Sequence, residues 1–131
     1  MMKQLSFLGI FMLVSITSGC QMNSGNSEVL KPSVFKDSIS KENIQLVDVR
    51  KPKEFKEFHI PGAININYFS DYFLDSLMVL DPECSVFIYC RSGKRSSKSV
   101  EQFEKAGFEK IYQLEGGLLE WKSNAFPTVS E

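Results

Sequence analysis

Short apolar segments alternate with amphipathic segments along most of the chain, and this alternation restricts the possible folds more than any other feature. Three segments, residues 44–49, 86–89 and 111–114, are rich in aliphatic, β-branched and aromatic residues and are bounded by polar turns. Such segments are typical of buried parallel strands. Residues 63–66 follow a Pro–Gly turn and predict a fourth strand, and the region near Val34 is expected to add a fifth at the edge.

Helical patterns lie between these expected strands. Residues 52–58, 70–80 and 96–106 place apolar side chains at helical spacing, and Gly107 is expected to close the last helix as its cap. Strands that alternate with helices predict an α/β fold. We therefore expect one mostly parallel five-stranded sheet with helices on both faces.

The amino terminus has the order of a secretory signal. Lys3 precedes an apolar run over residues 5–16, which small residues and then Cys20 follow. We expect residues 1–19 to be a signal peptide, residues 20–29 a lipidated cysteine with a flexible linker, and residues 30–131 the folded domain. The apolar run is too short to span a bilayer comfortably.

The cysteine after small residues resembles the lipobox of bacterial lipoproteins, which implies a lipid on Cys20. The domain would then lie outside the cytoplasm, on the periplasmic side, anchored to a membrane. The alternative is a plain secretory signal that is cut nearby and leaves Cys20 as a spare thiol.

Composition excludes several classes of protein. Fifteen basic residues against 16 acidic ones give a net charge of −1, which is not the balance of a general nucleic-acid binder. Three cysteines are too few for a disulfide scaffold, and no zinc-type pairing of Cys and His occurs. We expect neither a metal nor an organic cofactor. With 43% hydrophobic residues, the chain has enough apolar material for a conventional core.

The segment Cys90–Ser96 (CRSGKRS) joins the apolar segment 86–89 to a helical pattern and is the most informative part of the chain. Ligands of open α/β sheets bind at the carboxyl ends of the strands. A loop that turns from strand to helix presents backbone N–H groups and the positive end of the helix to an anion. Gly93 permits a sharp bend, and the segment adds three basic residues: Arg91, Lys94 and Arg95.

Cys90 begins this loop, and a helix amino terminus with nearby cations favours the thiolate form of a cysteine. The sequence therefore predicts a nucleophilic Cys90, with Arg91, Ser92, Gly93, Lys94, Arg95 and Ser96 as the substrate-binding loop. Ser92 either donates its hydroxyl to the bound sulfur or faces solvent, and Ser96 is expected to be the helix N-cap. The competing interpretation is a buried cysteine at the end of a strand, beside a solvated basic loop.

Several motifs in order resemble the rhodanese-like sulfurtransferases. They are LVDVR at 46–50, Glu54-Phe55, HIPGAINI at 59–66, the loop at 90–96, and Gly116-Gly117 with Trp121. The resemblance covers about residues 34–121. It implies that Cys90 accepts a sulfane sulfur as a persulfide within a six-residue loop, 90–95, and passes the sulfur to an acceptor. Phe58 stands where the family usually has Gly.

The resemblance also implies roles for the surrounding residues. Asp48 and Arg50 become supports that brace the loop. His59 could act as a base, but we expect it to hydrogen-bond the backbone beside the Pro61-Gly62 turn. Trp121 could line the pocket or pack in the core. Cys84 is separated from Cys90 by an extended strand of about 20 Å. Because a disulfide needs Cα atoms within about 7 Å, Cys84 is interpreted as a bystander.

The sequence thus predicts an extracytoplasmic sulfurtransferase. Its donor would be a small anionic compound such as thiosulfate or a persulfide, and its acceptor a thiol, cyanide or a protein. Related phosphatases and arsenate reductases of the same fold carry one more residue in the loop, so this chain's shorter loop favours sulfur transfer. Two further alternatives stay open: a non-catalytic rhodanese-like binding module, and redox chemistry of the lone thiol.

Overall fold

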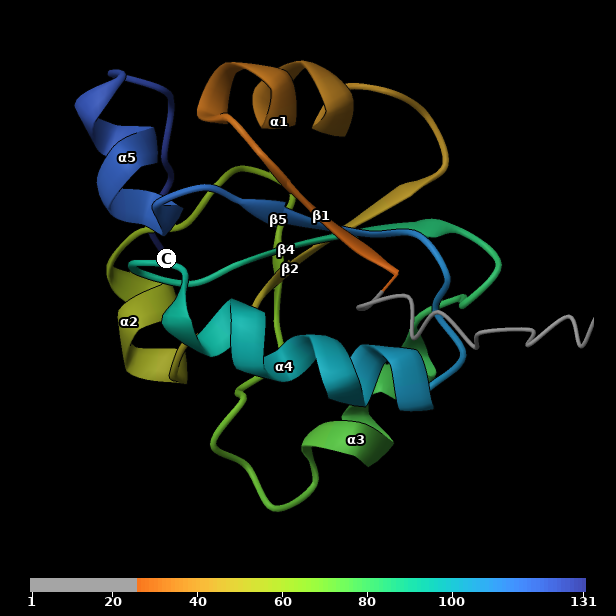
Figure 1. Ribbon diagram of the computed structural model, residues 1–131. Coiled ribbons are helices and arrows are strands. Elements are labelled where there is room, and N and C mark those ends of the chain that lie inside the picture. Colours follow the sequence, from red (N-terminus) through yellow and green to blue (C-terminus); the bar gives the residue numbers. More distant parts are fainter. Residues whose placement is uncertain (1–25) are drawn as a thin grey trace, which may run out of the picture.

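The computed structural model describes residues 26–131, which form a five-stranded parallel sheet with helices on both faces (Figure 1). The strands lie in the order β1-β5-β4-β2-β3, and every pairing is parallel. The predicted fold class is confirmed. The expected signal peptide, 1–19, and Cys20 lie outside the described residues. The elements are β1 Ser27–Leu30, α1 Pro32–Ile39, β2 Ile44–Asp48, α2 Pro52–Glu57, β3 Ile64–Asn65, α3 Phe73–Ser76, a 3₁₀ helix η1 Leu77–Val79, β4 Ser85–Tyr89, α4 Lys94–Lys105, β5 Ile111–Leu114 and α5 Gly117–Ser123.

Two apolar clusters, one on each face of the sheet, fix the helices in place. Side chains alternate across strands, so neighbouring residues of β4 face opposite clusters. Val86 and Ile88 pack with Phe103 of α4 in one cluster, whereas Phe87 packs with Phe35 of α1 and Trp121 of α5 in the other. Figure 1 accordingly shows α1 and α5 on one side of the sheet and α3 and α4 on the other. No helix within residues 26–131 is long and apolar enough to cross a bilayer.

The edge strand differs from the sequence prediction. The region near Val34 was expected to be a strand, but Val34 lies in α1, and the edge strand is β1 at Ser27–Leu30. Pro32 explains the helix, because proline favours the first helical turn. Residues 27–29 of the expected linker belong to the sheet, since β1 pairs with β5 from Ser27 onward.

The other deviations concern helix ends. The helix expected over 70–80 is shorter and becomes a 3₁₀ turn at Leu77–Val79. Ser70 forms a local turn before it, because its hydroxyl accepts the N–H of Tyr72 at 3.1 Å. Gly107 was expected to be the cap of α4, but the C-cap is Ala106, and Gly107 follows it with a left-handed φ of +97°.

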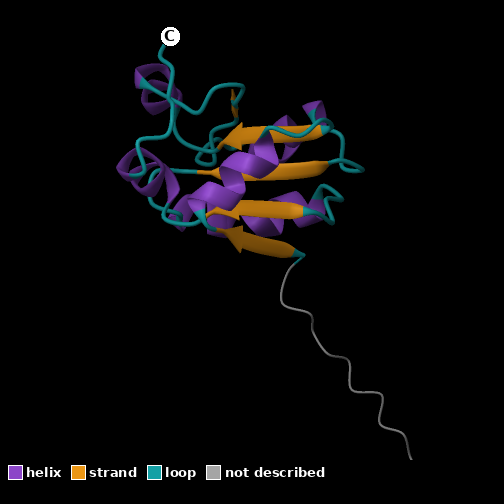
Figure 2. Cartoon of the chain, turned by 90° about the horizontal axis from the view of Figure 1, so that it is seen from above, coloured by secondary structure: helices purple, strands orange, loops and turns teal. Residues whose placement is uncertain are grey.

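All strands of the sheet run in one direction, so their carboxyl ends lie along one edge (Figure 2). Asp48 ends β2 and Tyr89 ends β4, and the two residues are register partners. The residues that follow them, including Arg50 and Cys90, therefore lie along the same edge. The topology gathers the predicted site residues at this edge.

Candidate active site

Cys90 follows β4 directly and is buried, with 1% of its surface exposed. Its sulfur accepts a hydrogen bond from the backbone N–H of Gly93 at 3.1 Å. The hydroxyl of Ser96 lies 3.5 Å from the same sulfur. Gly93 is the N-cap of the twelve-residue helix α4, so the thiol lies at the positive end of that helix. The structure therefore brings Cys90, Gly93 and Ser96 together.

Gly93 makes the bend that turns the chain from β4 into α4. Its φ is +98°, a left-handed conformation that a residue with a side chain adopts only with strain. Ser96 was expected to be the N-cap, but that position belongs to Gly93, and the prediction is wrong. Ser96 is buried in the first turn, where its hydroxyl donates to the Gly93 carbonyl at 3.2 Å. Its hydroxyl is thus held beside the sulfur instead of capping the helix.

The other side chains of the loop face outward. Arg91, Ser92 and Lys94 are exposed, so their side chains are open to ligands from solvent. Arg95 turns away to a carboxylate on α2. The guanidinium of Arg95 and the ammonium of Lys51 also lie over the ring of Phe69, at 5.8 and 5.4 Å from its centroid. Phe69 therefore borders the loop, although no motif in the sequence indicates this position.

The amino terminus of α5 supports the loop from behind. The backbone N–H groups of Leu118 and Leu119 donate to the carbonyls of Cys90 and Arg91, at 2.9 and 3.1 Å. These bonds fix two peptide groups of the loop with their carbonyls directed to α5. Gly117 permits the approach, because a Cβ on it would lie 2.5 Å from the Arg91 carbonyl oxygen. In the sequence the Gly116-Gly117 pair was only a family motif, and its contact with the loop was not predicted.

Glu54 of α2 supports the loop from the other side. Its carboxylate accepts two hydrogen bonds from the Arg95 guanidinium, at 2.7 and 2.9 Å, and a third from the Lys51 N–H at 3.0 Å. The bond to Arg95 is the main reason that the pKa of Glu54 is lowered to about 2 from 4.5. The same bond raises the pKa of Arg95. Glu54 was part of the family resemblance but had no assigned role.

Replacing Glu54 with glutamine is expected to lower the free energy of unfolding by about 0.5–1 kcal/mol at neutral pH, because the ion pair is partly exposed. A lowered pKa stabilises the fold above pH 4.5, and this contribution disappears as the pH falls toward 2. Wild type and variant should therefore converge in acid. Urea unfolding across this pH range measures the difference.

The matched control for this prediction is Glu57→Gln, on the same helix. Glu57 has no cation within 4.0 Å in the part of the chain that the structure describes. Its replacement should change stability little at any pH. A stability difference between wild type and Glu54→Gln that stayed constant down to pH 2 would contradict the assigned ion pair.

Asp48 and Arg50 form a buried ion pair at the end of β2, with an Nη2–Oδ2 distance of 2.7 Å. Arg50 also donates to the carbonyl of Phe58 at 2.6 Å. Tyr89 accepts the N–H of Ile60 at 3.0 Å, and burial, followed by the charge of Asp48, raises the pKa of the Tyr89 phenol. Among the described residues, neither side chain of the ion pair hydrogen-bonds to residues 90–96. The pair connects the sheet to residues 58–60.

His59 is not placed as a catalytic base. Its Nδ1 lies 2.8 Å from the carbonyl oxygen of Phe55, and because a carbonyl only accepts, Nδ1 donates. Its ring stacks on Phe55 with centroids 3.7 Å apart. Its backbone pairs with Val129 through two hydrogen bonds of 2.8 and 2.9 Å. The prediction that His59 bonds to the backbone is confirmed.

The positions of Cys84 and Trp121 agree with a bystander role for Cys84 and with core packing for Trp121. Cys84 precedes β4 and Cys90 follows it, so the two thiols are at opposite ends of one strand, and both are free. Partial burial and the nearby Asp81 carboxylate raise the pKa of Cys84. Trp121 is 1% exposed, and its indole N–H donates to the Pro127 carbonyl at 2.9 Å. It is a core residue.

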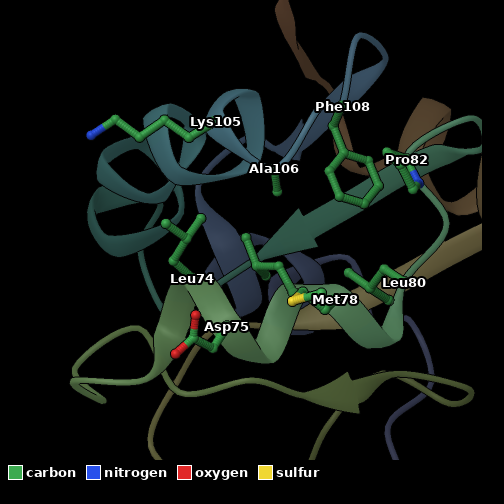
Figure 3. Close-up of a pocket in the computed structure, with 9 residues that line it drawn as sticks. Leu74, Asp75, Met78, Leu80, Pro82, Lys105, Ala106 and Phe108 are labelled. Carbon is green, nitrogen blue, oxygen red and sulfur yellow. The ribbon is translucent and has the colours of Figure 1, made fainter.

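An apolar pocket of about 430 Å³ lies away from this site, between α3, η1 and the end of α4 (Figure 3). Pro82 and Phe108 line it, and these residues precede β4 and β5, whereas Cys90 follows β4. The pocket is therefore at the opposite edge of the sheet and has no thiol in its walls. Within residues 26–131 no group of three or more His, Cys, Asp or Glu is arranged to hold a metal ion.

Comparison with known proteins identifies a family similarity over most of the described chain. Residues 31–124 match the family model described as Rhodanese-like domain. An uncharacterised protein of Synechocystis is 36% identical over 76% of this chain, and this chain spans 55% of that protein's length. Thiosulfate sulfurtransferase 18 of Arabidopsis thaliana is 31% identical over 66% of this chain and 73% of its own.

The solved structures agree with the sequence comparison. A rhodanese-related protein of Thermoplasma volcanium superposes with a TM-score of 0.70 at 25% identity, over 79% of this chain and 99% of its own. Several sequence relatives are longer: the chain spans 53% of a putative sulfur carrier protein of Bacillus subtilis, to which it is 27% identical.

Proposed function

This chain belongs to the rhodanese-like domain family, and we propose that it is a sulfurtransferase that carries a sulfane sulfur as a persulfide on Cys90. One observation carries the proposal: the Gly93 N–H lies 3.1 Å from the Cys90 sulfur, at the amino terminus of α4. A donor and a helix terminus directed at a buried sulfur stabilise negative charge there. That is the charge that a thiolate and a terminal persulfide sulfur carry.

The first step loads the enzyme. The Cys90 thiolate attacks the outer sulfur of thiosulfate, a new S–S bond forms at Sγ, and the old S–S bond breaks to release sulfite. The negative charge moves to the terminal sulfur of the persulfide. The amino end of α4 and the exposed cations Arg91 and Lys94 stabilise this charge.

The second step unloads the sulfur. A nucleophile such as cyanide attacks the terminal sulfur and forms thiocyanate. The S–S bond of the persulfide breaks, and its electron pair restores the Cys90 thiolate. The Ser96 hydroxyl lies 3.5 Å from Sγ and would donate to the departing thiolate once its proton turned from the Gly93 carbonyl. These two half-reactions predict ping-pong kinetics, because each leaves a stable form of the enzyme.

The size of the loop favours sulfur over a larger oxyanion. Only two residues separate Cys90 from Gly93, and the Gly93 N–H already contacts the sulfur at 3.1 Å. The carbonyls of Cys90 and Arg91 are bonded to α5, so the loop is not free to widen. A single additional sulfur needs less room than a tetrahedral phosphate or arsenate.

We propose that the domain acts outside the cytoplasm and is tethered to a membrane through a lipid on Cys20. The order of charge, apolar run and small residues before Cys20 supports this part of the proposal. It is independent of the sulfur chemistry.

The intact mass of the full chain tests both parts. After incubation with thiosulfate, Cys90 should gain the mass of one sulfur atom and lose it again on addition of cyanide. Failure to load with thiosulfate or with any persulfide would leave a non-catalytic binding module as the better description. Chain purified from bacterial membranes should also carry a diacylglyceryl group on Cys20. An unmodified Cys20 would refute the tether without affecting the sulfur chemistry.

A further inference from the structure

A second cavity, of about 300 Å³, opens beside the loop that holds Cys90. We call it the side pocket; its walls include Glu57, Phe58, Arg91, Leu118, Leu119 and Lys122. Its wall adjoins the backbone of Cys90: Arg91 follows Cys90 in the chain, and Leu118 donates its N–H to the Cys90 carbonyl at 2.9 Å. The volume equals that of about ten water molecules. A ligand in this pocket therefore lies next to the sulfur-binding loop.

Three charges of the side pocket are available to a ligand. Arg50 and Glu54 also line it, but Arg50 is paired with Asp48 and Glu54 with Arg95. Lys122, Arg91 and Glu57, in contrast, have no oppositely charged group within 4.0 Å among residues 26–131. All three side chains are exposed, so they retain their hydrogen-bonding capacity. The pocket thus offers two cations and one anion.

Phe58 gives the side pocket an apolar wall and positions one of these cations. The Lys122 ammonium lies 4.1 Å from the centroid of the Phe58 ring, a cation–π contact. The Arg50 guanidinium lies 5.3 Å from the same centroid. Leu118 and Leu119 add aliphatic surface. The pocket therefore combines opposite charges with room for methylene groups.

We propose that the side pocket binds the organic part of a low-molecular-weight persulfide of the α-amino-acid type. Lys122 and Arg91 would bind its carboxylate, Glu57 its ammonium group, and the apolar wall its methylene carbon. This inference rests on the proposed sulfurtransferase function and narrows its donor. Thiosulfate offers no ammonium group to Glu57 and no carbon to the apolar wall, so it would use the loop alone.

Sulfur then passes from the bound persulfide to Cys90. The Cys90 thiolate attacks the terminal sulfur of the persulfide RSSH, the S–S bond of the donor breaks, and RS⁻ leaves. Cys90 becomes the persulfide and the proton stays on the transferred sulfur. No oxidant, reductant or other reactant is needed.

The test compares rates of sulfur loading on Cys90, measured by rapid quenching and intact mass. The donors are thiosulfate, cysteine persulfide and the persulfide of 3-mercaptopropionate, which has a carboxylate but no ammonium group. Lys122→Gln should lower the rate with both persulfides, relative to the rate with thiosulfate, by about two- to fivefold, the effect of one exposed ion pair. Glu57→Gln should lower the rate of loading, relative to that with thiosulfate, by a similar factor with cysteine persulfide only.

Two matched variants control for net charge and for the cation–π contact. Lys36 lies over the Phe126 ring at 5.3 Å and is not part of the side pocket. Lys36→Gln therefore removes one positive charge and one cation–π contact outside the pocket. Glu109→Gln repeats the change of charge at another exposed acid. Both should leave the donor preference unchanged.

Loss of the donor site and loss of the sulfurtransferase function would give different results. If Cys90 loads but neither pocket variant changes the preference among the three donors, the side pocket is not a donor site. If neither thiosulfate nor either persulfide loads Cys90, the proposed function is refuted and the donor inference falls with it.

Discussion

Replacing Cys90 with serine is expected to abolish sulfur transfer, with turnover lowered by about 10⁴-fold or more, as is typical when an enzyme loses its covalent nucleophile. A serine hydroxyl is not ionised at neutral pH and does not form a persulfide. The measurement is the production of thiocyanate from thiosulfate and cyanide. Because the substitution preserves the shape of a side chain that is 1% exposed, the fold should persist.

Cys84→Ser is the matched control for this variant. Cys84 is the other thiol among the described residues, and it lies at the opposite end of β4. Its loss should leave turnover unchanged. Thiocyanate production that persisted in Cys90→Ser, or that disappeared in Cys84→Ser, would contradict the assignment of the nucleophile.

Replacing Gly117 with alanine is expected to lower turnover by about 100-fold, through displacement of the loop. The added Cβ would lie 2.5 Å from the Arg91 carbonyl oxygen and 2.6 Å from that of Cys90, so the loop or α5 must move. The hydrogen bonds from Leu118 and Leu119 to these same carbonyls would lengthen or break. The Gly93 N–H, which contacts the sulfur at 3.1 Å, would then lose its alignment. Thiocyanate production and urea unfolding measure the two effects.

Gly62→Ala separates backbone strain from displacement of the loop. Gly62 has a φ of +84°, comparable to +60° at Gly117, but a Cβ on Gly62 meets nothing within 4 Å. A left-handed alanine costs about 1–2 kcal/mol in either place. Gly62→Ala should therefore lose stability and keep its turnover. If both variants lost turnover in proportion to stability, the contact of Gly117 with the loop would have no specific role.

The fold could be predicted from the sequence because its strands are apolar and its helices amphipathic. Residues 44–48 of the expected segment 44–49, and residues 111–114, lie in the sheet, and Cys90 stands at the turn from strand to helix. The edge strand β1 was missed because Glu28 and Val29 are exposed at the sheet edge, so Ser27–Leu30 lacks the apolar signal of a buried strand. Val34 lies in a helix, which the proline two residues earlier could have indicated.

The contacts that support the loop were less predictable than the loop itself. Glu54 pairs with Arg95, which is 41 residues away, and no local pattern connects them. The role of Gly117 depends on the approach of α5 to Cys90 and Arg91, which only the packed structure shows. Ser96 was assigned to the N-cap because serine favours that position, but the left-handed conformation of Gly93 starts the helix earlier. Tertiary contacts therefore decided these roles.

The parallel pairing of β1 places the entry of the chain into the sheet at the edge opposite Cys90. Ser27 begins β1 beside Ile111, the first residue of β5, whereas Cys90 follows the opposite end of β4. A strand of this length separates the two edges by roughly 15 Å. If the lipid on Cys20 fixes the chain to a bilayer, the entry point would lie on the membrane-proximal side and the thiol on the distal side. A soluble acceptor could then approach the persulfide from the open compartment, without competing with the lipid surface.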